Sequence, residues 1–320
     1  MHTLKNIFSS SGAGAPYRFA KLARGMPYEL STIRWHLDTR PAETVLLLHD
    51  LLASRLCWSV LHNRMAPLIE EGLTPAAPLH LYAPQLRHHR RRDSDLDITG
   101  DDCTIDCYAA DVVAFYNKFL SGRSVHLVGH GFGAYVAIAS ATALPPNAAA
   151  SITVINAKPQ LDPSQTDASR LNLFEAISQE MVRSIPAGSP PSSYGRWVRE
   201  KLPIPFEASL LLQHLNNGHI DLDFQALRLS VAQLSPEAFS PIAGHLNGLK
   251  CSATVISNGE NAAAEGAQDI LRFLPNVKSV TTEADLFHGC VKPDDGKAIA
   301  KLILQSCGLL GAISEDNPTA

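Results

Sequence analysis

The chain of 320 residues carries 27 lysines and arginines against 31 aspartates and glutamates, which gives a formal net charge of −4 at pH 7. This small balance excludes a strong overall attraction to nucleic acid or anionic membranes, and no apolar run reaches the roughly 18 residues of a membrane span. Because 45% of the residues are hydrophobic, the chain can bury a full core.

The first 26 residues are basic and contain no acidic side chain. Lys5, Arg18, Lys21 and Arg24 lie there with a cluster of serines, and the first acid is Glu29. This composition is typical of a mitochondrial targeting segment, whereas a secretory signal needs an apolar central region. A flexible basic arm is the alternative interpretation. The segment favours a mitochondrial protein, in the matrix or on the matrix face of the inner membrane.

The rest of the chain alternates between short apolar strands and helical segments, the pattern of a parallel α/β sheet. Strands are predicted at 45–49, 80–83, 125–128, 152–155, 253–257 and 277–282, and helices at 58–71, 105–120, 132–144 and 296–305. The stretch 163–247 interrupts the alternation, since it reads as wholly helical. We therefore expect a core at 27–162 and 248–310, a helical lid insert at 163–247, and a tail at 311–320.

One short motif joins a strand, a glycine-rich turn and a helix: HLVGHGFGA, at 126–134. This is the shape of G-x-S-x-G, the nucleophile elbow that presents a catalytic serine. The central residue is Gly131, which has no side chain. Gly129 and Gly133 keep the spacing for close packing of strand and helix, and glycine relieves the backbone strain that a serine would bear. The sequence thus predicts an elbow without its nucleophile.

Seven motifs in order resemble the α/β-hydrolase fold, and within it the mitochondrial and bacterial esterases of the abhydrolase-domain-eleven type. They are VLLLHDLLASRLCW, RHHRRRDS, LVGHGFGA, VINAKP, FEASLLLQHLNNGHIDLDFQAL, VISNGENA and EADLFHGCVKPDD. The likeness covers nearly everything from Pro27 onward. It implies a mostly parallel central sheet flanked by helices, with a helical lid insert, and an ancestry among serine esterases.

The resemblance also assigns catalytic positions, and the chain departs from the family at each. The nucleophile falls at Gly131 and the acid at Asn156, whose amide cannot supply the charge that stabilises an imidazolium. The base falls at Leu286, or at His288 if the loop shifts by two residues. Asp50 replaces a glycine of the oxyanion turn, where a carboxylate repels developing negative charge unless it points away. We therefore expect a pseudoenzyme of the serine esterase class, with no catalytic residues.

A basic run follows the strand at 80–83. Arg87, Arg90, Arg91 and Arg92 form a candidate docking patch for an acidic protein surface or for anionic lipid headgroups. Three aspartates follow at once, so a solvated loop with local ion pairs is the alternative. No aromatic platform accompanies these charges, and we expect no nucleic-acid partner.

The six cysteines show neither a disulfide framework nor zinc-ligand spacing. We expect free thiols in a reducing compartment, and neither a metal ion nor a cofactor.

Three functions stay open at this point. The favoured one is a non-catalytic, structural accessory subunit of a mitochondrial multiprotein complex, with the respiratory chain as the preferred assembly and other subunits as partners. The second is a binding module that holds an acyl chain or small ligand in the vacated pocket. The third is an enzyme with a rearranged site, in which His288, His49 or Asp50 acts with water.

Overall fold

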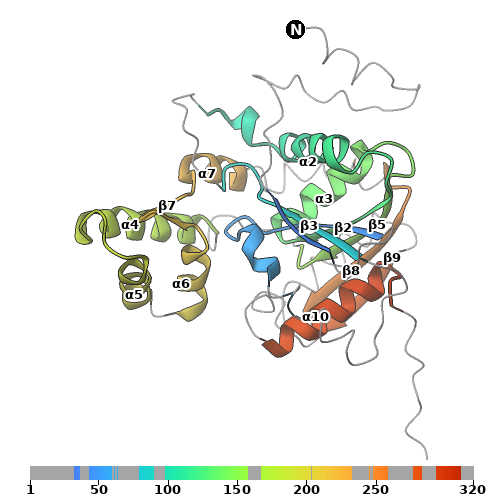
Figure 1. Ribbon diagram of the computed structural model, residues 1–320. Helices are drawn as coiled ribbons and strands as arrows, with labels where there is room; N and C mark the ends of the chain where they lie inside the picture. The colour runs from blue at the N-terminus through green and yellow to red at the C-terminus, as the bar shows by residue number, and fades with distance from the viewer. Residues whose placement is uncertain are drawn as a thin grey trace, which may run out of the picture.

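The computed structural model describes residues 32–36, 43–59, 61, 63, 79–89, 98–157, 167–202, 204–232, 245, 248–258, 277–282 and 293–310. A central sheet carries helices on both faces, and a helical lobe stands to one side of it (Figure 1). The predicted fold class, a mostly parallel sheet with a helical insert, is confirmed.

The sheet has seven strands in the order β1-β3-β2-β4-β5-β8-β9. All neighbours pair in parallel except β1, which runs antiparallel to β3. The strands are β1 (Thr32–His36), β2 (Glu43–Leu48), β3 (Leu79–Pro84), β4 (Val125–His130), β5 (Ala149–Ile155), β8 (Ser252–Asn258) and β9 (Val277–Thr282). Six of them match the predicted strands, whereas β1 was not predicted.

Helices α2 (Ile105–Phe119) and α3 (Phe132–Ala143) cover one face of the sheet, and α10 (Pro293–Ser306) covers the other (Figure 1). Strands covered on both faces need apolar side chains throughout rather than in alternation. Val45 to Leu48 in β2 illustrate this, because all four are fully buried. The carboxyl ends of the parallel strands therefore meet at one edge of a rigid core, where binding sites of such sheets form.

We call the insert the lid. The prediction that it is wholly helical is wrong. It contains α4 (Asp167–Ser184), α5 (Pro191–Lys201), α6 (Pro205–Leu212) and α7 (Phe224–Ala232). Between α6 and α7, strands β6 (Leu215–Asn216) and β7 (His219–Ile220) form a hairpin. Its turn residues, Asn217 and Gly218, have φ angles of 48° and 83°. Asn-Gly with positive φ at both positions is the preferred two-residue hairpin turn.

Several predictions fall outside the described residues: the targeting segment at 1–26, the tail at 311–320, and most of the helix expected at 58–71. In the described parts of the chain, none of the helices has both the length and the apolar character that a bilayer crossing requires. Among the cysteines that are described, Cys57, Cys103 and Cys307 are buried and Cys107 and Cys251 are half-buried, and none of these five forms a disulfide.

Candidate functional site

The elbow after β4 keeps its backbone geometry. Gly131 has φ 53° and ψ −117° and directly precedes α3. A Cβ on Gly129 would lie 2.3 Å from the Gly133 carbonyl oxygen, and one on Gly133 would lie 2.3 Å from the Leu48 carbonyl oxygen. Both flanking positions therefore require glycine, as the motif predicted, and the strand, turn and helix remain packed as in a serine hydrolase.

The Asp50 carboxylate occupies the space beside Gly131, the predicted nucleophile position. A Cβ built on Gly131 would lie 2.2 Å from Asp50 Oδ1 and 2.6 Å from Asp50 Oδ2. Since a serine hydroxyl extends further than Cβ, no serine fits here while Asp50 keeps this conformation. Asp50 follows β2 and reaches the elbow across the edge of the sheet, so the carboxylate points toward the site rather than away from it.

The same carboxylate also occupies the position that the resemblance predicts for the oxyanion hole. Asp50 Oδ1 accepts hydrogen bonds from the backbone N–H of Phe132 (2.7 Å) and of Leu51 (2.8 Å). In a serine hydrolase the N–H after the nucleophile and an N–H from a neighbouring loop bind the substrate oxyanion. Phe132 follows Gly131, and Leu51 lies in the turn that the resemblance identifies as the oxyanion turn. Both donors are thus satisfied by the chain's own carboxylate, which also caps the first turn of α3.

The predicted acid position carries no charge in the structure. Asn156 directly follows β5 with φ 49°, and its side-chain Oδ1 is buried without a hydrogen-bond partner among the described residues. The nearby His130, which ends β4, likewise has a buried Nε2 atom without a partner there. Burial lowers the pKa of His130, and the Asp50 carboxylate offsets this in part. The two predicted base positions, Leu286 and His288, lie outside the described residues, so their assignment stays a prediction.

His49, a candidate base of the rearranged enzyme, has both ring nitrogens engaged. Its Nδ1 donates to the Asp50 carbonyl oxygen (2.8 Å), and its Nε2 accepts from the Leu86 N–H (3.0 Å). Burial lowers the pKa of His49 well below its usual value, and neighbouring His89 lowers it further. An imidazole whose only lone pair is already held by an N–H cannot take a proton from water.

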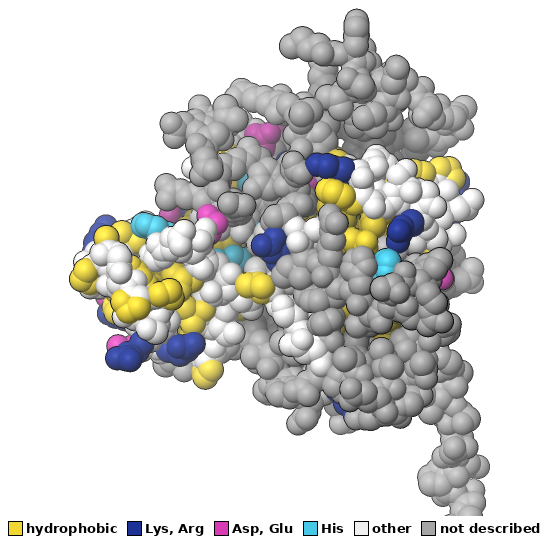
Figure 2. All heavy atoms as spheres, in the orientation of Figure 1, with side chains coloured by type: hydrophobic (Ala, Val, Ile, Leu, Met, Phe, Trp, Pro, Cys, Tyr) yellow, Lys and Arg dark blue, Asp and Glu magenta, His cyan; other side chains and the backbone are white. Residues whose placement is uncertain are grey.

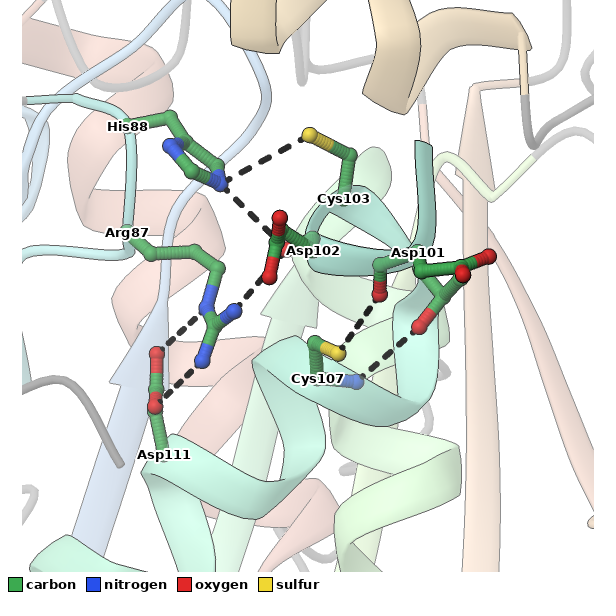
Figure 3. Close-up of polar contacts among 8 residues, drawn as sticks. Arg87, His88, Asp101, Asp102, Cys103, Cys107 and Asp111 are labelled. Atoms are coloured by element: carbon green, nitrogen blue, oxygen red, sulfur yellow. Dashed lines mark hydrogen bonds and ion pairs between the residues drawn. The ribbon is translucent and has the colours of Figure 1, made fainter. Parts of the chain in front are cut away.

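Arg87 does not belong to an exposed docking patch, which corrects the prediction for this residue. Its Nε and Nη2 atoms donate to the two carboxylate oxygens of Asp111 at 2.6 Å each, and its Nη1 donates to the Asp102 carbonyl oxygen at 2.8 Å (Figure 3). Both side chains are buried. Burial alone would lower the pKa of Arg87, but the Asp111 carboxylate more than offsets this and raises it. Arg90, Arg91 and Arg92 lie outside the described residues.

Beside this ion pair, Cys103 and His88 lie side by side but do not form an activated thiol. Cys103 Sγ is 3.8 Å from His88 Nε2 (Figure 3). Burial raises the pKa of Cys103 to about 12, which outweighs a hydrogen bond to Ser230 that lowers it. The thiol therefore stays protonated at neutral pH, whereas a nucleophilic cysteine needs a thiolate.

Two further histidines lie between a hydroxyl and a carboxylate, in the manner of a triad but away from the elbow. They are His126, between Ser151 Oγ (2.8 Å) and Glu43 Oε2 (3.4 Å), and His245, between Thr142 Oγ1 (2.8 Å) and Asp106 Oδ1 (2.9 Å). The first group lies at the amino ends of the strands, opposite the edge that carries Gly131, and Ser151 is buried. The Thr142 hydroxyl also donates within α3 to Ala139. The first group joins neighbouring strands of the sheet, and the second joins His245, near the end of the insert, to α2 and α3.

The alpha/beta hydrolase family profile matches residues 45–287, and the chain belongs to this family. Solved structures with a similar fold include a thioesterase domain from the curacin biosynthetic pathway, with 18% sequence identity over 86% of this chain and 95% of that chain and a TM-score of 0.58. An enol-lactonase from Burkholderia xenovorans LB400 has 14% identity over 87% and 96%, with a TM-score of 0.59. A marine microorganism esterase has 14% identity over 88% and 99%, also with a TM-score of 0.59. No curated protein matches the sequence of this chain.

Proposed function

We propose that this chain is a non-hydrolytic member of the alpha/beta hydrolase family, related to the esterases of the abhydrolase-domain-eleven type. The observation that supports this best is the position of Asp50, whose Oδ1 accepts the N–H groups of Phe132 and Leu51. A substrate carbonyl needs those donors and the space beside Gly131, and the carboxylate takes both. Asn156 adds no charge for a catalytic imidazolium.

Its proposed role is that of a structural accessory subunit in a mitochondrial protein complex, with an assembly of the respiratory chain favoured. Support comes from the basic, acid-free segment at 1–26 and from a fold kept intact around a closed site. The lid also exposes Leu173, Val182 and Ile204, each with at least 40% of its surface accessible. Figure 2 shows hydrophobic and basic side chains together on one face of the lid. Such mixed surfaces suit contacts with other subunits, while Arg90 to Arg92 offer a secondary contact with anionic lipid.

A ligand-binding module is the second candidate, and a specific observation favours it. Buried polar atoms nearly always have hydrogen-bond partners, yet His130 Nε2 and Asn156 Oδ1 lack one among the described residues. His130 ends β4 and Asn156 directly follows β5, at the edge of the sheet that carries the elbow. A small polar ligand seated there would satisfy these atoms.

Gentle extraction from mitochondria, native separation and identification of co-migrating proteins would distinguish the two roles. We expect the chain to migrate with a defined set of mitochondrial proteins. Migration as a monomer that retains an extractable small molecule would instead support the binding module. A ligand-free monomer, or a location outside mitochondria, would contradict the accessory role.

The absence of hydrolysis is tested with the purified protein and a panel of acyl esters and thioesters. We expect no turnover above the buffer rate, because the nucleophile is missing and the oxyanion donors are occupied. Turnover that is lost in Asp50→Asn or His288→Ala would overturn this proposal and establish a rearranged enzyme. Turnover that survives in both variants would point to a contaminating hydrolase, and repurification should then remove it.

A further inference from the structure

Three buried imidazoles from distant parts of the chain meet beside the Asp50 turn. His49 follows β2, His89 follows β3, and His214 follows α6 in the lid. The ring centroids of His49 and His89 are 4.5 Å apart, and those of His89 and His214 are 6.3 Å apart. All three are at most 4% exposed. We call this group the histidine seam, because it lies where the lid meets the core.

Each of the three rings contacts the carbonyl oxygen of a different residue in one turn, and these three residues are consecutive in the chain. His49 Nδ1 contacts the Asp50 carbonyl oxygen at 2.8 Å, His89 Nε2 contacts that of Leu51, and His214 Nε2 contacts that of Leu52 at 3.2 Å. The neighbouring lid residue Gln213 reinforces the contact, since its side-chain oxygen accepts from the N–H and the hydroxyl of Ser54. The seam therefore holds the lid and the turn that positions the Asp50 carboxylate in one arrangement.

Burial disfavours a positive charge on all three rings, whereas the carbonyl oxygens of Arg87 (2.9 Å from His89 Nδ1) and Leu51 favour one on His89. Burial lowers the pKa of His49, His89 and His214, for His214 to about 3. Repulsion from His89 lowers the pKa of both His49 and His214 further, while backbone contacts and Asp50 offset part of the effect of burial on His89. Of the charged groups that act on the seam, Arg55 also lowers the pKa of His49, and Asp50 raises that of His89.

We propose that the histidine seam is an acid-sensitive latch, which holds α6 and the β6–β7 hairpin against the Asp50 turn at neutral pH and releases them when its imidazoles are protonated. Release exposes the rings to water, where histidine titrates near pH 6.5. Opening therefore takes up protons below that pH. The closed state keeps its full stability above pH 6.5 and loses it as the pH falls toward the lower pKa values of the buried rings.

Hydrogen–deuterium exchange of the full chain at several pH values tests the latch. After correction for intrinsic exchange, we expect the opening equilibrium of 205–221 and 49–54 to rise about tenfold per pH unit below 6.5 for each ring that is neutral in the closed state. Protection of β4 and α3 should stay constant over the same range. Protection of the lid that does not depend on pH, or that falls together with that of β4 and α3, would overturn the proposal.

Two glutamine variants separate the seam from other titrating groups. His214→Gln keeps an N–H donor for the Leu52 carbonyl oxygen but cannot be protonated. Lid opening should therefore take up one proton fewer, and the opening equilibrium should depend less steeply on pH. His219→Gln is the matched control, because His219 lies exposed in the same hairpin and should leave the dependence unchanged. An equal change in both variants, or none in His214→Gln, would rule out the latch. If His214→Gln does not fold, the pH profile of the natural chain still decides.

Discussion

Replacing Asp111 by alanine is expected to lower the free energy of unfolding by about 3–5 kcal/mol, because Arg87 then keeps a buried charge without its partner. The guanidinium makes two parallel hydrogen bonds to this carboxylate, and its third donor already serves the Asp102 carbonyl oxygen (Figure 3). Because Asp111 is only 1% exposed, bulk water does not readily reach the guanidinium to replace the lost contact. Urea denaturation at neutral pH measures the change.

Two further variants test whether burial of the Arg87–Asp111 ion pair is the cause of this large loss of stability. In Arg87→Met/Asp111→Leu neither charge remains, so most of the lost stability should return. Glu180→Ala removes the half-exposed partner of Lys201 in the lid, and should cost about 1 kcal/mol or less. A loss below about 1 kcal/mol in Asp111→Ala would show that the pair is solvated in solution, and would restore Arg87 as a candidate for the docking patch.

Apolar runs and glycine spacing were enough to predict most of the core. Strands such as β2 are buried on both faces, and their unbroken apolar stretches leave few alternatives. Gly129, Gly131 and Gly133 identify the elbow because each must tolerate either a close backbone approach or a positive φ. The sequence analysis did not predict the β6–β7 hairpin, although Asn217 and Gly218 are typical of its turn. Its strands are only two residues long, and the hydrophobic pattern of the flanking helices dominates the segment.

The contents of the site depend on contacts that sequence spacing does not reveal. Asp50 and the Phe132 N–H are 82 positions apart, so only the fold shows that the carboxylate fills the elbow and caps α3. Arg87 lies in a run of basic residues that looks solvated, yet Asp111 on the buried side of α2 draws it inward. His214 joins His49 and His89 only because the lid folds back on the core.

Gly131→Ser is expected to destabilise the protein by about 2–5 kcal/mol, which combines the cost of overpacking with that of backbone strain. The new Cβ would lie 2.2 Å from Asp50 Oδ1, and the backbone at this position has a positive φ of 53°. Asp50→Gly alone should cost about 1–2 kcal/mol, because the N–H groups of Phe132 and Leu51 lose their acceptor. Thermal and urea unfolding of Gly131→Ser, of Asp50→Gly and of the double variant that carries both substitutions complete a double-mutant cycle.

The double variant decides whether Asp50 and the elbow compete for one space. Asp50→Gly removes the three atoms nearest to the new Cβ, so the two losses should be less than additive, by about 1–3 kcal/mol. Additive losses would mean that Asp50 lies elsewhere in solution. Neither Gly131→Ser nor the double variant should hydrolyse esters, since Asn156 still supplies no charge to a base. Ester turnover by either would show that the acid or the base has been placed at the wrong residue, and that the chain keeps more of its ancestral machinery than Asp50 and Asn156 suggest.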